Sequence, residues 1–288
     1  MLSGLLLVDK PKGMTSMQVV EGIKSRFRVK AGHAGTLDPI ATGLLLVLVG
    51  EATKFSQFFI GLDKAYITLA RLGEIRDTYD AEGKILETRP VGVSCQDIRN
   101  ALENFVGKLL QTPPPFSAKR IEGKRAYELA RKGVEVQPKP VEVEVYRAEL
   151  RRCELPFVEL YFEVSSGTYI RSLVHELGLS LSCGAYVAEL RRLRVGRFSL
   201  DMAVSYERLM KLEDLTGLLM PVDVALDFIP ALHLSLSMAK RIKHGMFIQL
   251  RQEVEKTFVR LYEGESFIGV GLMEGRFLKP YRLIQHVS

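Results

Sequence analysis

The chain has 288 residues, of which 47% are hydrophobic and 26% charged, a composition that allows a sizeable core and excludes disordered or collagen-like proteins. Its net charge of +6 is compatible with a polyanionic partner. The longest apolar run, Leu44 to Val49, is far shorter than the roughly 20 residues of a membrane-spanning helix, so we expect no membrane insertion.

Cysteine and histidine spacing bears on redox and metal chemistry. The three cysteines, Cys95, Cys153 and Cys183, are isolated and odd in number, and no C-x-x-C or H-E-x-x-H spacing occurs. We therefore expect neither a disulfide framework nor a metal site. No basic region precedes the short apolar segment at residues 2–8, so no signal peptide is expected and the cytoplasm is the predicted location.

Apolar spacing predicts helices and strands in the first part of the chain. Val19, Val20, Ile23 and Phe27 recur at helical spacing, which predicts a helix that Thr15 or Ser16 caps and that runs to about Arg26. The other elements expected here are strands at residues 4–9, 44–49 and 64–72, a helix at 51–59 and a loop at 30–42.

The second part also mixes strands and helices. A turn-rich segment, 73–84, precedes an amphipathic helix that Ser94 caps with Asp97 three residues on. The remaining expectations are helices at 127–132 and 168–181, strands at 141–146, 157–164 and 186–195, and a boundary near 227–230 followed by several short strands. This irregular alternation predicts an α+β fold with a mixed sheet.

A carboxylate on a glycine-flanked loop is the first candidate for chemistry. In Gly32-His33-Ala34-Gly35-Thr36-Leu37-Asp38-Pro39, the residue before proline is biased toward extended backbone, and two glycines permit close backbone approach. His33 precedes Asp38 by five positions, which makes a reactive site plausible. The alternative is that Asp38 caps the following segment.

The second candidate is Arg171 in Ser165-Ser166-Gly167-Thr168-Tyr169-Ile170-Arg171, where a strand gives way to a helix. The first turn of a helix is electrostatically unfavourable for a cation. A buried carboxylate partner would explain the placement, since a guanidinium binds a carboxylate with two parallel hydrogen bonds. The alternative is an exposed, solvated arginine.

Basic residues gather in three places. The first is residues 119–132, which contain six Lys or Arg and two Glu. The second is the cluster of Arg191, Arg192, Arg194 and Arg197. The third is residues 230–288, which carry nine Lys or Arg against five Asp or Glu. Such segments suit a phosphate backbone, although a solvated surface is the commoner use of a charge run.

Taken in order, these motifs resemble one family. They are residues 7–13 (LVDKPKG), 32–43 (GHAGTLDPIATG), 50–54 (GEATK), 63–66 (DKAY), 114–118 (PPFSA), 167–173 (GTYIRSL) and 189–193 (ELRRL). Together they resemble the TruB family of bacterial tRNA pseudouridine-55 synthases over about residues 4–200. Residues 241–248 (RIKHGMFI) are similar to that family's small PUA-type RNA-binding domain.

The resemblance implies a fold and a division of the chain. It implies a pseudouridine-synthase fold with a mixed, largely antiparallel sheet and a small β-rich PUA-like C-terminal domain. The catalytic domain would span residues 1–228, with an RNA-binding insertion at about 112–150, and the PUA-like domain would span 229–288.

The resemblance also implies an isomerase that converts uridine 55 in the T-arm of tRNA to pseudouridine. The nucleotide would be flipped out, its base detached from the ribose at N1 and reattached through C5. The family needs no metal and no organic cofactor, and it suggests a monomer. Asp38 would be the catalytic carboxylate, acting either on the ribose directly or as the base that removes the C2′ proton.

Further site residues follow from the same resemblance. Arg171 would be the ion partner of Asp38, Tyr66 would stack on the base, Tyr169 and Leu190 would line the uracil pocket, and His33 would lie near the vacated stack. The expected RNA contacts are Lys10, Lys119, Arg120, Lys124, Arg125 and Tyr127. The chain departs from the family pattern at Ala34, Phe116 and Arg120, where the family usually has threonine, tyrosine and lysine.

Two other function classes remain to be weighed. The basic loop and tail would also suit an RNA-binding protein that helps tRNA fold, with or without catalysis. A zinc-dependent base deaminase would likewise flip a base, but its H-x-E and P-C-x-x-C signature is missing.

Overall fold

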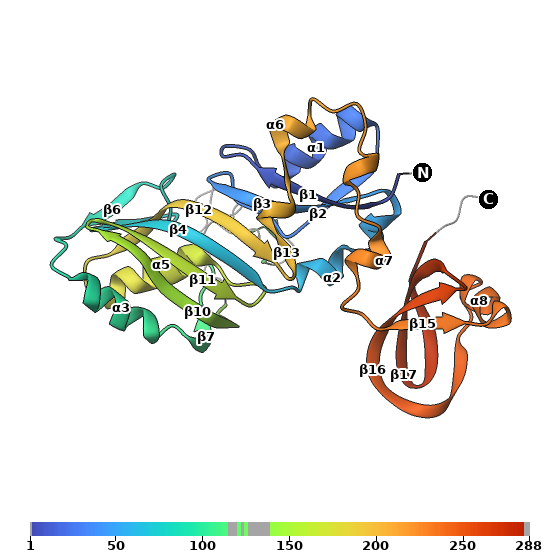
Figure 1. Ribbon diagram of the computed structural model, residues 1–288. Helices are drawn as coiled ribbons and strands as arrows, with labels where there is room; N and C mark the ends of the chain where they lie inside the picture. Colours follow the sequence, from blue (N-terminus) through green and yellow to red (C-terminus); the bar gives the residue numbers. More distant parts are fainter. Residues whose placement is uncertain (1, 115–119, 122–123, 126–138, 285–288) are drawn as a thin grey trace.

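A computed structural model of the chain describes residues 2–114, 120–121, 124–125 and 139–284. Its main feature is a ten-stranded sheet in the order β14-β1-β3-β12-β4-β11-β10-β7, with β2 beside β3 and β13 beside β12 (Figure 1). These strands are β1 (Gly4–Lys10), β2 (Ala31–Ala34), β3 (Ala41–Val49), β4 (Lys64–Leu72), β7 (Gly107–Gln111), β10 (Val141–Glu154), β11 (Phe157–Val164), β12 (Ala185–Val195), β13 (Phe198–Ser199) and β14 (Val204–Ser205).

The sheet is mixed and largely antiparallel, which confirms the predicted fold class. The β1–β14 and β3–β12 pairs are parallel, and the other described pairs of this sheet are antiparallel. The shorter elements outside it are β5 (Glu74–Arg76), β6 (Ile85–Thr88), β8 (Arg120–Ile121), β9 (Lys124–Arg125), the 3₁₀ helices η2 (Leu200–Met202) and η3 (Thr216–Leu218), and α6 (Tyr206–Leu209).

Helices cover both faces of the sheet. On one face, α1 (Ser16–Phe27), α3 (Cys95–Glu103) and α5 (Ile170–Ser180) contribute to a core that includes Leu45 and Val47. On the other face, η1 (Gly50–Phe55), α2 (Ser56–Ile60) and α7 (Val222–Ala225) pack in a core with Leu44 and Leu46. A strand buried on both faces needs a continuous apolar run, which is what residues 44–49 supply.

Two helices begin where the sequence predicts. Thr15 caps α1, with Gln18 completing a capping box, and Ser94 caps α3, with Asp97 completing another. In each box the side chain of the cap residue accepts from the backbone N–H of the residue three positions later. The side chain of that later residue accepts in turn from the backbone N–H of the cap residue, so two otherwise unpaired donors are satisfied. Both ends are local features, so neighbouring residues suffice to define them.

Three of the expected elements differ from the structure, and the expected helix at 127–132 lies outside the described residues. The expected loop at 30–42 contains β2, which pairs with residues 46–49 of β3 beyond the stretch that β12 reaches. The expected helix at 51–59 is a 3₁₀ turn, η1, followed by the short α2. The described tail has two long strands and one short strand instead of several short ones. The first difference depends on the pairing of residues 31–34 with residues 46–49, which the local pattern of the expected loop does not specify.

The C-terminal residues form a second, three-stranded sheet of β15 (Ala231–Leu234), β16 (Ile248–Glu263) and β17 (Ser266–Leu283), with α8 (Leu236–Lys243) beside it (Figure 1). Its own core includes Leu234, Ile242 and Leu261. The Phe58 and Phe258 rings, 5.0 Å apart and edge to face, connect this unit to α2. In the part of the chain that the structure describes, no helix has the length and apolarity to cross a membrane.

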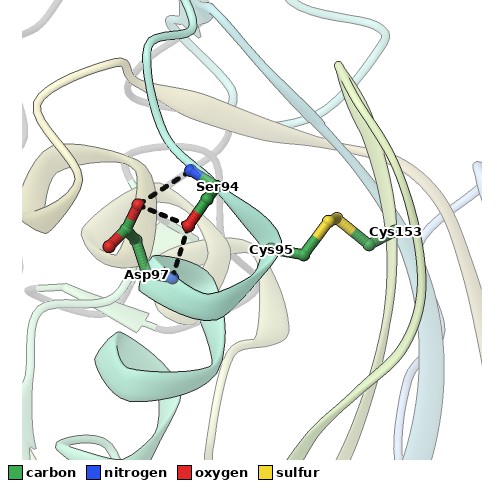
Figure 2. Close-up of a disulfide and its surroundings, with 4 residues drawn as sticks. All are labelled: Ser94, Cys95, Asp97 and Cys153. Atoms are coloured by element: carbon green, nitrogen blue, oxygen red, sulfur yellow. Dashed lines mark hydrogen bonds between the residues drawn. A yellow bond between two sulfur atoms is a disulfide. The ribbon is translucent and has the colours of Figure 1, made fainter.

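Cys95 and Cys153 form a disulfide, which the expectation of no disulfide framework did not foresee (Figure 2). The two residues are 58 positions apart, and their Cα atoms lie 6.0 Å apart because the start of α3 packs beside β10. Cys183 remains a free, buried thiol. Sequence spacing could not reveal the pair because only the packing of a helix on a sheet brings the two thiols together.

We expect the disulfide to stabilise the fold by about 2–4 kcal/mol, since it closes a long loop in the unfolded chain. Urea unfolding of the oxidised protein should therefore show a higher midpoint than unfolding in the presence of a thiol reductant. The Cys95→Ser/Cys153→Ser double variant is the control, because reductant should no longer shift its midpoint. Equal midpoints for the oxidised and reduced protein would contradict this expectation.

Candidate active site

A cleft of about 530 Å³ opens on the sheet between the loop after β2 and the start of α5. Five of the residues that the sequence singles out line it: Asp38, Tyr66, Tyr169, Arg171 and Leu190. They come from separate parts of the chain, and β12 brings them together because it lies between β3 and β4. Gly35, Lys64 and Arg192 also line the cleft.

Asp38 lies on the short loop between β2 and β3. Gly35 has φ of +89°, a conformation that glycine adopts without strain and that turns the chain out of β2. The Ser16 hydroxyl accepts from the Leu37 N–H at 2.8 Å and donates to the Leu37 carbonyl at 3.0 Å. The Asp38 side chain is 38% exposed, so its carboxylate is held by a fixed loop and still open to the cleft.

Arg171 is buried at the start of α5 and binds two carboxylates. Its Nη2 lies 2.9 Å from Asp38 Oδ2, and its Nη1 lies 3.2 Å from Asp80 Oδ2. Nη1 also donates to the Thr78 carbonyl at 3.0 Å. The sequence predicts one carboxylate partner for Arg171, and the structure places a second one, Asp80, on the other side of the guanidinium. The side chains of Arg171 and Asp80 are each only 5% exposed.

Asp80 is the site residue that the sequence analysis missed. It lies in the polar turn between β5 and β6, where its Oδ1 accepts from the Thr78 hydroxyl at 2.6 Å and from the Glu82 N–H at 3.0 Å. The only local signal was a turn-rich, acidic segment, which is usually solvated. Nothing in that pattern indicates that Arg171, 91 positions later, would cover the carboxylate.

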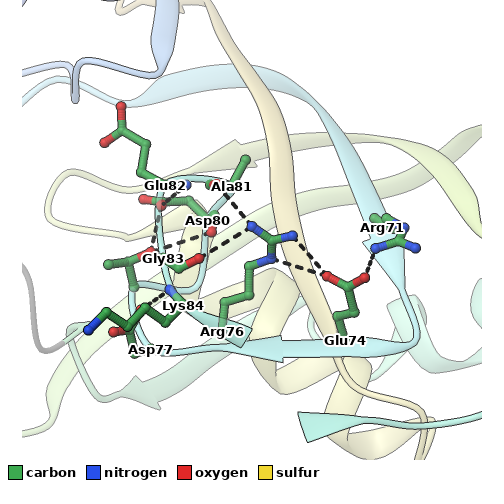
Figure 3. Close-up of polar contacts among 10 residues, drawn as sticks. Arg71, Glu74, Arg76, Asp77, Asp80, Ala81, Glu82, Gly83 and Lys84 are labelled. Atoms are coloured by element: carbon green, nitrogen blue, oxygen red, sulfur yellow. Dashed lines mark hydrogen bonds and ion pairs between the residues drawn. The ribbon is translucent and has the colours of Figure 1, made fainter. Parts of the chain in front are cut away.

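A buried ionic network holds this turn in place (Figure 3). Arg76 Nη1 donates to the carbonyls of Ala81 and Gly83 at 2.9 and 3.3 Å. Its Nη2 pairs with Glu74 at 2.9 Å, and Arg71 pairs with the other oxygen of Glu74. Since Glu74 is itself buried, the two arginines supply the charge compensation that a buried carboxylate needs.

The apolar and aromatic walls of the cleft are also fixed by the backbone. Tyr66 on β4 and Leu190 on β12 are nearly buried side chains on adjacent strands. Tyr169 is the N-cap residue of α5, and the buried Gln111 side chain accepts from its N–H at 2.7 Å and donates to its carbonyl at 3.0 Å. This amide clamp sets where α5 begins, and hence where Arg171 enters the cleft.

The other predicted contact residues lie elsewhere. His33 is half-buried on β2 opposite Val47 and is not among the described residues that line the cleft. In the expected RNA-binding insertion, the backbones of Arg120 and Lys124–Arg125 belong to the paired strands β8 and β9. Lys119 and Tyr127 lie outside the described residues.

Lys10 contradicts the expectation of an RNA-contacting lysine. It is 0% exposed, and its Nζ donates to the carbonyls of Met14 at 2.6 Å, Pro11 at 2.9 Å and Pro39 at 3.5 Å. Burial lowers the pKa of Lys10 to about 8. A lysine in a Lys-Pro-Lys-Gly turn would be expected to present its charge at the surface. The Lys10 side chain instead supports the backbone next to Asp38.

Within residues 2–114 and 139–284, no group of three or more His, Cys, Asp or Glu side chains is arranged to hold a metal ion. The chemistry that the described cleft offers is that of one accessible carboxylate beside a buried guanidinium, with a phenol and apolar walls around it.

We expect Asp80→Asn to destabilise the fold by about 3 kcal/mol, because removing one partner of a buried pair leaves the other charge undercompensated. Glu82→Gln on the same turn is the control, since its side chain is exposed and its loss should cost less than about 0.5 kcal/mol. Urea unfolding of both variants measures the difference. Equal stability of the two variants would show that the Arg171–Asp80 pair contributes nothing.

The whole described cleft falls within regions that match known family models. Residues 23–170 match the model described as "TruB family pseudouridylate synthase (N terminal domain)". Residues 171–227 match "tRNA pseudouridylate synthase B C-terminal domain", and residues 230–284 match "Pseudouridine synthase II TruB, C-terminal".

Relatives cover the chain from end to end. A protein of Aquifex aeolicus (strain VF5) named tRNA pseudouridine synthase B is 46% identical over 286 residues, which are 98% of this chain and 100% of the relative. One of Haemophilus influenzae (strain PittEE) with the same name is 41% identical over 292 residues, covering 98% and 95%.

Solved structures share the fold. A chain in the crystal structure of a Cbf5-Nop10-Gar1 complex is 26% identical with a TM-score of 0.72, and the match covers 95% of this chain and 79% of that one. One in an H/ACA RNP bound to a substrate RNA containing 2′-deoxyuridine has a TM-score of 0.74 at 24% identity, covering 98% and 85%. Family models and relatives together show that the chain belongs to the TruB family of pseudouridylate synthases.

Proposed function

We propose that this chain converts uridine 55 in the T-arm of tRNA to pseudouridine, with Asp38 as the catalytic carboxylate. The observation that carries the proposal is the accessible Asp38 carboxylate, ion-paired to Arg171 at 2.9 Å in a cleft that Tyr66, Tyr169 and Leu190 also line. Relatives named tRNA pseudouridine synthase B match nearly the whole chain and support tRNA as the substrate.

The reaction requires Asp38 in its ionised form. The base is detached from the ribose at N1, turned, and reattached through C5; the C5 proton is released to solvent and N1 takes up a proton, so the product is an isomer of uridine. Asp38 either attacks the ribose or removes the C2′ proton. In both cases it must be ionised, because the carboxylate can act as a nucleophile or a base and the protonated carboxylic acid cannot. Arg171 supports both routes, since a guanidinium stabilises the charged carboxylate and fixes its direction. Neither route needs a metal or an organic cofactor.

Access to the cleft requires a flipped nucleotide. Extruding a base costs a few kcal/mol of lost stacking, which new contacts must offset. In our proposal Tyr66 stacks on the flipped uracil, Tyr169 and Leu190 form the pocket wall, and His33, outside the cleft lining, supports the stack that the nucleotide leaves. Aromatic and imidazole faces recover about 1–3 kcal/mol per stacked base.

The remaining parts of the chain would bind the rest of the RNA. We assign catalysis to residues 1–228 and RNA binding to the insertion at 112–150 and to a PUA-like domain at 229–288. On the insertion, the proposed contacts to the phosphate backbone are Lys119, Arg120, Lys124, Arg125 and Tyr127. We further propose that the protein acts as a monomer in the cytoplasm, although the Cys95–Cys153 disulfide is uncommon in that compartment.

We expect Asp38→Asn to lower tritium release from a [5-³H]uridine-labelled T-arm stem-loop by at least about a hundredfold, because a carboxamide is neither a base nor a nucleophile. Filter binding should show that the dissociation constant for the stem-loop changes by no more than a few-fold. Asp201→Asn, at an exposed aspartate of η2, is the matched control and should release tritium at the native rate.

Two results would overturn the proposal. The first is tritium release by Asp38→Asn at the native rate, and the second is no release by the native chain from RNA that it binds. Mapping the position of pseudouridine in full-length tRNA distinguishes uridine 55 from other positions. Pseudouridine elsewhere would retain the isomerase and exclude the T-arm assignment.

A tRNA-folding activity is the second candidate. Its supporting observation is the exposed basic face of α8, formed by Lys240, Arg241 and Lys243, on a C-terminal unit of net positive charge. If this activity exists, the Asp38→Asn variant should accelerate the refolding of denatured tRNA as fast as the native chain does. No acceleration by either protein would exclude it.

A further inference from the structure

Arg192 is a buried cation that the proposed reaction does not use. It lies on β12 in register with Gly43 on β3 and Tyr66 on β4, and it is only 1% exposed. Burying a guanidinium is costly unless its charge and its donors are satisfied. Nevertheless, among the described residues no carboxylate oxygen lies within 4.0 Å of its nitrogens to form a salt bridge.

Backbone carbonyls take the place of a carboxylate. Nε donates to the Leu44 carbonyl at 2.7 Å, Nη2 to the Gly35 carbonyl at 2.9 Å and Nη1 to the Thr36 carbonyl at 3.4 Å. Leu44 belongs to the central strand β3, whereas Gly35 and Thr36 begin the loop that carries Asp38. The planar, forked guanidinium thus joins the loop to the sheet through three separate nitrogens, whereas a lysine would present its donors at a single point.

The surroundings accommodate this contact closely. Gly43 has φ of +98°, and a Cβ atom there would lie 2.3 Å from the Arg192 carbonyl oxygen, so only glycine lets β3 approach β12 at this point. On the far side of Asp38, the Pro39 carbonyl accepts from the Gly13 N–H at 2.8 Å. The loop is therefore held on both sides of the carboxylate, and Arg192 is its anchor on the Gly35 side.

We propose that Arg192 is a positioning residue for Asp38: it holds the Gly35–Thr36 backbone against β3 so that the carboxylate is presented to the flipped nucleotide in a reactive geometry. The inference rests on the proposed function for its kinetic readout only. A displacement of the reacting group by about 1 Å can cost about a hundredfold in rate, so the loss of this anchor should lower kcat while leaving RNA binding intact.

The test compares Arg192→Lys and Arg192→Met with the control Arg194→Met. Arg194 lies two positions along the same strand, is partly exposed, and pairs with Glu163 and with the Gly196 carbonyl, not with the Asp38 loop. We expect kcat for tritium release to fall about 10- to 100-fold in Arg192→Met and less in Arg192→Lys. KM and the dissociation constant for the stem-loop should stay within about threefold, and Arg194→Met should keep the native kcat.

Hydrogen–deuterium exchange of the backbone amides of residues 35–38 measures how firmly Arg192 holds the loop, and it needs no substrate. We expect faster exchange of this segment in both Arg192 variants and native exchange in Arg194→Met. If Arg192→Met does not fold, Arg192→Lys carries the test, because it retains the charge. Native kcat together with native exchange in a folded Arg192 variant would overturn the inference, as would a loss confined to RNA affinity.

The two proposals fail in different ways. A native chain that releases no tritium refutes the proposed function, while faster exchange confined to the Arg192 variants would still support the anchor. Conversely, native turnover with exchange unchanged by Arg192→Met refutes only the anchor.

Discussion

The binding of two carboxylates by one buried guanidinium is the interaction on which the site depends. Arg171 stands in the first turn of α5, where the helix dipole disfavours a cation, and it is removed from water. Asp80, equally buried, compensates that charge, while Asp38 on the other side keeps a side chain that is 38% exposed. This asymmetry bears on the chemistry that we propose, because Asp80 shares the compensation of the buried arginine while the carboxylate of Asp38 stays accessible to a substrate.

Asp80 can have this role only if its turn is rigid. Arg76 holds the turn through two carbonyls, and Arg171 holds it through the Thr78 carbonyl. The Tyr79 ring stacks on His175, one helical turn after Arg171 on α5, with ring centres 3.8 Å apart and planes 7° from parallel. Tyr79 has φ of +62°, an uncommon conformation for a side chain of this size, which persists only where surrounding contacts enforce it. Helix α5 therefore contacts the turn through Arg171 and again, one helical turn later, through His175.

Buried cations that bind backbone carbonyls are a second theme around the cleft. Lys10 supports Pro39, Arg192 supports Gly35 and Thr36, and Lys64 donates to the carbonyls of Ile60 and Leu62. Burial is the main reason that the pKa of Lys64, like that of Lys10, falls to about 8, and repulsion from Arg192 adds to it in both cases. Lys10 and Arg192 in this way hold the loop of Asp38 through main-chain atoms, while Lys64 holds the end of α2 and the residues that follow it.

The sequence by itself determined what depends on neighbours in the chain. Helix caps at Thr15 and Ser94, the apolar run of β3 and the alternation of β4 follow from local spacing, and the motifs around Asp38 and Arg171 indicated the family and the ion pair. Tertiary structure alone decided which segments meet: it formed the Cys95–Cys153 disulfide, paired β2 with β3, brought the second carboxylate Asp80 to Arg171 and buried Lys10. The local sequence of a polar turn, or of a lysine beside a proline, is the same whether the segment faces water or protein. Its exposure depends on which other segment packs against it.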